Sequence, residues 1–179
     1  SLAWTHDDKG FFYSRYPTPK SFENKDDPNW QRGTETDANL HQAVYYHRLG
    51  TPQDQDILVL NHPVAPMRSR FLLRSYPRRV QTEPKWMSVA EVSEDGETAL
   101  FSISESTDPV NRLYLARLTG KSVPDDGKLQ IIKLIDNFDA LYEYITNDGP
   151  VFYFKTNLNA PRYRVIAIDV TKPEQEHWR

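Results

Sequence analysis

A short pattern recurs three times along the 179-residue chain and restricts the folds that it can adopt. Each copy has an apolar residue, then Ser or Thr, then an Asp-Gly or Asp-Asp pair, and then an apolar segment. The copies begin at Trp4, Val92 and Ile145. Asp-Gly pairs tolerate the positive φ of a tight turn, so each copy is typical of two antiparallel strands joined by a hairpin.

A second landmark follows the hairpin in two of the copies. Pro109 and Arg112 match Pro161 and Arg164, with proline and arginine three residues apart in both. Two landmarks in register indicate a true repeat. Further apolar stretches predict a third strand over 43–50, 113–118 and 163–169, and a fourth strand over 56–60 and 129–135.

The repeat predicts an all-β fold: a partial β-propeller of about three four-stranded antiparallel blades. The turn residues Asp95 and Asp148 are 53 residues apart, which suits the period of about 40–50 residues that is typical of blades. A single four-stranded sheet cannot cover both of its faces, and stacking around an axis buries them. A sandwich is less favoured, because sandwiches are seldom built from one recurring four-strand unit.

The chain divides into blades and insertions. We expect a blade over 1–60 with an inserted loop at 17–39, an Arg-rich insertion at 61–84, a blade over 85–138, and an incomplete blade over 139–179. The first insertion is polar and proline-containing, which is typical of a functional or disordered connection. The second is typical of a solvated loop, with a nucleic-acid patch as a minor alternative. Its unusual composition also suggests a non-native splice segment.

Composition narrows the partners and the location. Hydrophobic residues make up 38% of the chain, which is enough for a packed core. The net charge of −3 argues against nucleic acid or an anionic membrane as the main partner. No apolar run approaches the roughly 20 residues that span a membrane. The chain has no cysteine and no N-x-Ser/Thr sequon, and we expect a cytoplasmic location.

The sequence contains no recognisable catalytic motif. The serine-hydrolase elbow G-x-S-x-G is absent, and Gly120-Lys121-Ser122 lacks the earlier glycine of a phosphate-binding loop. The histidines, at 6, 41, 47, 62 and 177, do not have metal-ligand spacing. The recurring aspartates Asp7, Asp95 and Asp148 are expected to cap turns. We therefore predict no catalytic, cofactor-binding or metal-binding residue in this chain.

Longer strings of residues, taken in order, carry a family resemblance. They are 4–13 (WTHDDKGFFY), 33–36 (GTET), 39–42 (NLHQ), 45–47 (YYH), 83–87 (EPKWM), 108–113 (DPVNRL), 133–138 (KLIDNF), 144–147 (YITN) and 154–157 (FKTN). Together they resemble the N-terminal β-propeller of prolyl oligopeptidase (prolyl endopeptidase), along nearly the whole chain.

The resemblance implies a seven-bladed propeller joined to an α/β-hydrolase domain. That domain would carry a Ser-Asp-His triad and cleave short peptides after proline, while the propeller would act as a gate that excludes folded proteins. This chain would supply about three blades, and the hydrolase domain and its triad would be absent from it. The loop at 17–39 falls where the family has a mobile loop near the domain interface. The segment at 61–84 departs from the family, in which this link is short.

The favoured hypothesis is a substrate-gating segment of a prolyl oligopeptidase-like serine peptidase. Its partners would be short proline-containing peptides, reached through the full-length enzyme, and the hydrolase domain of the same parent chain. The chain alone would be inactive, and we expect it to be a fragment of a longer protein. The alternative is a non-catalytic propeller scaffold for protein interactions. A dipeptidyl-peptidase-like relative is a third option, which the missing sequons make less favoured.

Overall fold

The computed structural model describes residues 2–17, 40–61, 85–105 and 107–179. Within this part the chain forms eleven strands and two short 3-10 helices, Gln53–Gln55 and Gln175–His177. The insertions predicted at 17–39 and 61–84 lie outside the described residues, apart from Pro17 and Asn61.

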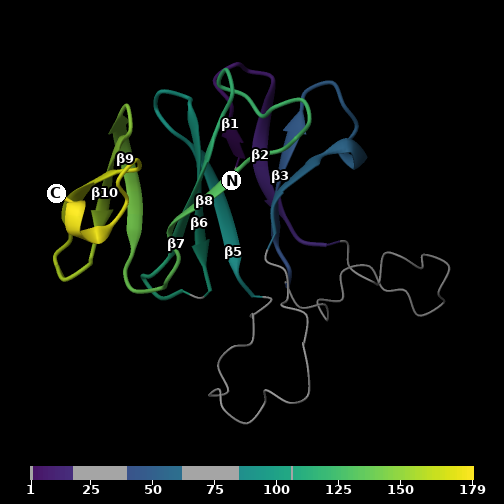
Figure 1. Ribbon diagram of the computed structural model, residues 1–179. Helices are drawn as coiled ribbons and strands as arrows, with labels where there is room; N and C mark the ends of the chain where they lie inside the picture. Colours follow the sequence, from purple (N-terminus) through teal and green to yellow (C-terminus); the bar gives the residue numbers. More distant parts are fainter. Residues whose placement is uncertain (1, 18–39, 62–84, 106) are drawn as a thin grey trace, which may run out of the picture.

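Three antiparallel sheets stand side by side and follow one another along the chain (Figure 1). The first contains β1 (Leu2–Trp4), β2 (Gly10–Arg15), β3 (Ala43–Arg48) and β4 (Ile57–Leu60). The second contains β5 (Met87–Val92), β6 (Thr98–Ser104), β7 (Arg112–Arg117) and β8 (Ile131–Ile135). The third contains β9 (Tyr142–Asp148), β10 (Val151–Thr156) and β11 (Arg164–Asp169). Within each sheet, every strand pairs with the next one along the chain.

The predicted all-β architecture of stacked antiparallel sheets is confirmed, with one difference in the third sheet. Among the described residues this sheet has three strands, where the first two sheets have four. On the free side of β11, the backbone of Arg179 exchanges two hydrogen bonds with Ala167, of 2.7 and 3.1 Å. The end of the chain therefore lies where the other two sheets have their fourth strand.

The repeat is visible in the turns, but its third copy differs. Asp7 accepts a hydrogen bond from the backbone N–H of Lys9 at 3.2 Å, and Asp95 accepts one from Glu97 at 2.9 Å. These two aspartates cap their turns as the sequence predicts. Asp148 instead belongs to β9 and pairs with Val151, because this hairpin is two residues long. A tight hairpin leaves no wide turn to cap.

The middle sheet is buried on both faces, because a neighbouring sheet covers each of them. Successive residues of β6 point to opposite sides and so reach both cores. Phe101 packs against Phe12 of the first sheet with ring centroids 6.0 Å apart, while Leu100 contacts the third sheet. The core between the first and second sheets includes Phe12, Val44, Tyr46, Ala99, Phe101, Ile103, Tyr114 and Ala116. The core between the second and third sheets includes Leu100, Leu113, Leu115, Tyr142, Phe152, Phe154, Ile166 and Ile168.

The outer faces of the first and third sheets lack such a cover among the described residues. Leu2 and Trp4 on the first sheet, and Ile145 and Val165 on the third, are each roughly half exposed. The Trp4 ring lies 4.9 Å from that of Phe11 on its own sheet, at a tilt of 56°. Stacking therefore buries the middle sheet and leaves the two end sheets each with one apolar face open.

Candidate functional site

The first strands of the sheets carry the candidate site. Strands β1 and β5, which begin neighbouring sheets, lie against each other. Along β5, Met87, Val89 and Glu91 are exposed, whereas Ser88 and Ala90 between them are buried. One face of β5 therefore belongs to the core and the other remains open to a ligand.

A groove of about 450 Å³ lies beside this open face, where the second sheet meets the third. Val89, Leu100 and Leu141 contribute apolar walls to it, and Glu91 contributes a carboxylate. Glu91 keeps access to solvent, but partial burial in the groove raises the pKa of its carboxyl group. The groove thus combines apolar walls with polar side chains, which include the carboxylates of Glu91 and Glu143.

Polar contacts at the turn end of the molecule join the second sheet to the third. Asn147 Nδ2 donates to Asp95 Oδ2 at 2.6 Å, and Tyr144 Oη accepts the backbone N–H of Glu94 at 3.0 Å. Partial burial raises the pKa of Asp95, but hydrogen bonds from Ser93, Glu97 and Asn147 outweigh it, and the net pKa lies below its usual value. These bonds favour an ionised Asp95 at the contact between the sheets.

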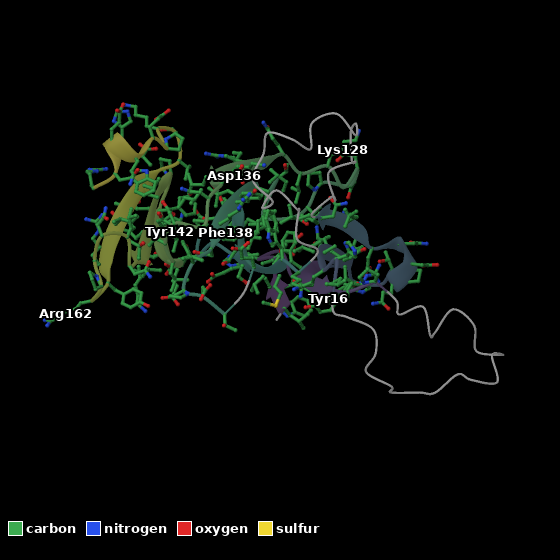
Figure 2. The ribbon with its side chains drawn as sticks, turned by 90° about the horizontal axis from the view of Figure 1, so that it is seen from below. Tyr16, Lys128, Asp136, Phe138, Tyr142 and Arg162 are labelled. Atoms are coloured by element: carbon green, nitrogen blue, oxygen red, sulfur yellow. The ribbon has the colours of Figure 1, made fainter. Side chains whose placement is uncertain are left out.

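A buried asparagine makes the corresponding contact near the other end of these strands. Asn111 is 2% exposed and precedes β7. Its Nδ2 donates to the carbonyl of Tyr142 at 3.0 Å, and its Oδ1 accepts the Tyr142 N–H at 2.7 Å. One side chain thereby satisfies both backbone groups of a β9 residue, as a neighbouring strand would. Figure 2 shows Tyr142 near the middle of the molecule, with Arg162 at its periphery.

The first and second sheets are joined by a separate set of contacts. Arg48 forms an ion pair with Asp125 and also donates to the carbonyl of Val123 at 3.4 Å. These residues border a hollow of about 650 Å³ between the turns of the two sheets. Tyr46 and Ser122 hydroxyls lie 3.5 Å apart across the same boundary.

Arg112 packs against two aromatic rings. Its guanidinium lies 4.5 Å from the ring centre of Trp86 and 4.6 Å from that of Phe138. It also pairs with Asp136 at 2.8 Å. Contacts of a cation with aromatic faces stabilise this arrangement. The guanidinium therefore holds together the residues that flank β5, β7 and β8.

The histidines named in the sequence do not form a metal site in the described part of the chain. His41 has a φ of 60° and precedes β3, whereas His47 lies within that strand. His47 is 2.7 Å from Asp56. Among the described residues, no group of three His, Cys, Asp or Glu side chains could hold a metal ion.

The helices that the structure describes are too short and too polar to span a membrane.

Sequence reasoning missed the residues that join the sheets. Asn111 lies inside the repeated Pro–Arg segment, but its partner Tyr142 is 31 residues away. Glu91 lies on a strand with clear alternation, and that alternation was the one signal that could have placed it on an open face. The neighbouring groove itself depends on residues of four strands, β5, β6, β7 and β9, and of the segments that precede β7 and β9.

Antiparallel sheets that stack face to face, one after another along the chain, define the blades of a β-propeller. More particularly, the chain belongs to the family described as "Prolyl oligopeptidase, N-terminal beta-propeller domain", which matches residues 1–79 and 78–179. The family resemblance read from the sequence is confirmed.

Several relatives and solved structures support this membership. Prolyl oligopeptidase A of Amanita bisporigera is 35% identical over 174 residues, which are 97% of this chain and 19% of that protein. The prolyl endopeptidase of Dictyostelium discoideum is 33% identical and covers 95% of this chain and 20% of its own length. Prolyl oligopeptidase B of Galerina marginata, bound to a 35-residue hydrolysis and macrocyclization substrate, superposes with a TM-score of 0.72 at 31% identity. That superposition covers 100% of this chain and 20% of the other. The chain thus spans about a fifth of the length of these relatives.

Proposed function

We propose that this chain is the substrate-gating part of a serine-type endopeptidase that hydrolyses short peptides after proline. Its contribution would be steric: a rigid stack of blades limits the opening through which peptides reach a catalytic domain elsewhere in the parent protein. Membership of the prolyl oligopeptidase propeller family carries the proposal. The chain itself would supply no catalytic residue.

The contacts between the sheets support a rigid gate. Two cores join the second sheet to its neighbours, and two sets of buried or partly buried polar contacts join it to the third sheet. Polar groups that are satisfied across such a boundary become costly to separate, since separation leaves them unpaired. A rigid opening would admit flexible peptides and reject folded proteins.

Two measurements test this proposal. The purified 179-residue chain should not cleave a Gly-Pro reporter peptide, and a longer polypeptide that joins it to a hydrolase domain should cleave the reporter. That longer polypeptide should also leave intact a folded protein with a proline in an exposed loop, and should cleave it after unfolding. Cleavage of the reporter by the chain alone would contradict the assignment, and equal cleavage of folded and unfolded protein would contradict the gate.

A non-catalytic scaffold is the second candidate, and the comparisons do not favour it, because the relatives named above are peptidases. The parent's hydrolase domain and its proline-containing peptides remain proposed partners. The blade boundaries at 60, 84 and 138 and the cytoplasmic location also remain predictions. Limited proteolysis of the parent protein would test the blade boundaries, and cell fractionation would test the location.

A further inference from the structure

The groove beside β5 has features of a binding site that a gate alone does not require. Its volume of about 450 Å³ falls within the range of roughly 300–1,000 Å³ that is usual for small-ligand sites. Its apolar walls come from both sheets: Val89 and Leu100 from the second, and Leu141 from the segment that leads into β9. The two sheets thus form one hollow beside an exposed stretch of β5.

Glu91 is the charge in this groove that lacks a partner among the described residues. The other glutamate of the lining, Glu143, forms an ion pair with Lys155 at 2.8 Å. In the part of the chain that the structure describes, the Glu91 carboxylate has neither an ion pair nor a hydrogen bond. Its partial burial disfavours the ionised form, and a cation placed beside it would relieve that cost.

The position of the groove relates it to the proposed gate. Blades of a propeller surround a central channel, and strands β5 and β9 are the first strands of their sheets. Met87, Val89 and Glu91 project from the same face of β5, so a ligand moving past this strand meets two apolar side chains and then a carboxylate.

We propose that this groove binds the side chain of a lysine or arginine residue of the peptide substrate. Lysine and arginine have an apolar stem and a cationic end, and they commonly bury the stem while the charge remains near water. The stem would lie along Val89, Leu100 and Leu141, and the cation would pair with Glu91. The inference rests on the proposed function for the identity of the ligand, and it adds a preference for basic peptides to the size limit of a gate.

The test uses the longer polypeptide that joins this chain to its hydrolase domain. The substrates are N-acetylated proline peptides that differ in one residue, lysine or norleucine, placed in turn at successive positions before the proline. Acetylation removes the terminal ammonium, so that only the side chain supplies a cation. At the best position we expect kcat/KM to be about three- to tenfold higher for lysine, because partly buried ion pairs contribute modestly. The Glu91→Gln variant should bring this ratio close to one.

The matched control is Glu97→Gln, because Glu97 is an exposed glutamate in the turn before β6 and does not line the groove. This variant should keep the lysine preference, and thermal unfolding would show that both variants are folded. A lysine preference that persists in Glu91→Gln, or its absence at every position in the unmodified protein, would overturn the inference. If neither peptide is cleaved, the proposed function fails. Anisotropy with fluorescent lysine and norleucine peptides would then still show whether Glu91 binds the cation.

Discussion

Replacement of Asn111 by alanine tests how the second and third blades are held together. The Asn111 side chain satisfies both backbone groups of Tyr142, with hydrogen bonds of 3.0 and 2.7 Å. Both residues are only 2% exposed, so the two backbone groups are shielded from bulk solvent. Each buried backbone group left unpaired costs about 1–3 kcal/mol, and two such groups give an expected loss of about 3–4 kcal/mol at this contact.

Hydrogen exchange followed by mass spectrometry measures this loss directly, because it reports the stability of individual segments. A tenfold change corresponds to about 1.4 kcal/mol, so the Asn111→Ala variant should lose protection over β9 by a factor of about 100 to 1,000. Strands of the first sheet should keep their protection, since their core does not include Asn111. The measurement should use the longer polypeptide, in which both outer faces of the blades can be covered.

Ser102→Ala is the matched control for this experiment. It removes only the hydrogen bond from Asn111 Nδ2 to Ser102 Oγ, of 2.8 Å, and leaves the Tyr142 backbone paired. We expect it to cost at most about 1 kcal/mol, or roughly a fivefold loss of protection. If the two variants had the same effect on β9, the asparagine would not be what joins these blades, and the reasoning would be refuted.

Two further substitutions test the turn end of the same blades. Asp95→Asn should lower the urea midpoint of the propeller, because it weakens the bonds that Asp95 accepts from Asn147 and the turn. Since the pKa of Asp95 lies below its usual 3.8, its contribution is complete above that pH and disappears as the pH falls through the lowered value. The difference in urea midpoint between wild type and variant should therefore become smaller below about pH 4, and a difference that stays constant would contradict this account. Gly96→Ala should destabilise by about 1–2 kcal/mol or more in thermal unfolding, because Gly96 has a φ of +76° and a Cβ would lie 2.6 Å from His6 Nδ1. Adding His6→Ala should restore only the stability lost to the steric contact with His6. Full restoration would show that the backbone conformation at position 96 costs no stability.

The local features of the fold could be predicted because they depend on neighbouring residues. The Asp-Gly pair at Asp95 indicates a turn, and the alternation through β5 indicates a strand with one buried face. The same reasoning failed where one local pattern was compatible with two structures. Asp148 has the sequence of a capping residue, but the shorter hairpin places it in a strand.

The candidate site could not be predicted in the same way. Nothing near Asn111 in the sequence identifies Tyr142 as its partner, and the partial burial of Glu91 depends on residues of another blade. Hydrogen bonds and desolvation act over a few ångströms in space, whatever the separation along the chain. Local patterns in a single sequence do not show which distant residues come within those distances.

The sequence by itself determined the repeating unit and the all-β class of this chain, because turn chemistry and side-chain alternation act between adjacent residues. The family followed from a resemblance carried by longer strings of residues and matched by the family model. Only the tertiary structure decided which faces of the sheets meet, and hence that the middle sheet is covered on both faces, while among the described residues each end sheet is covered on one. It also decided that Glu91 lies in a groove between two blades, since that environment exists only after the blades have stacked.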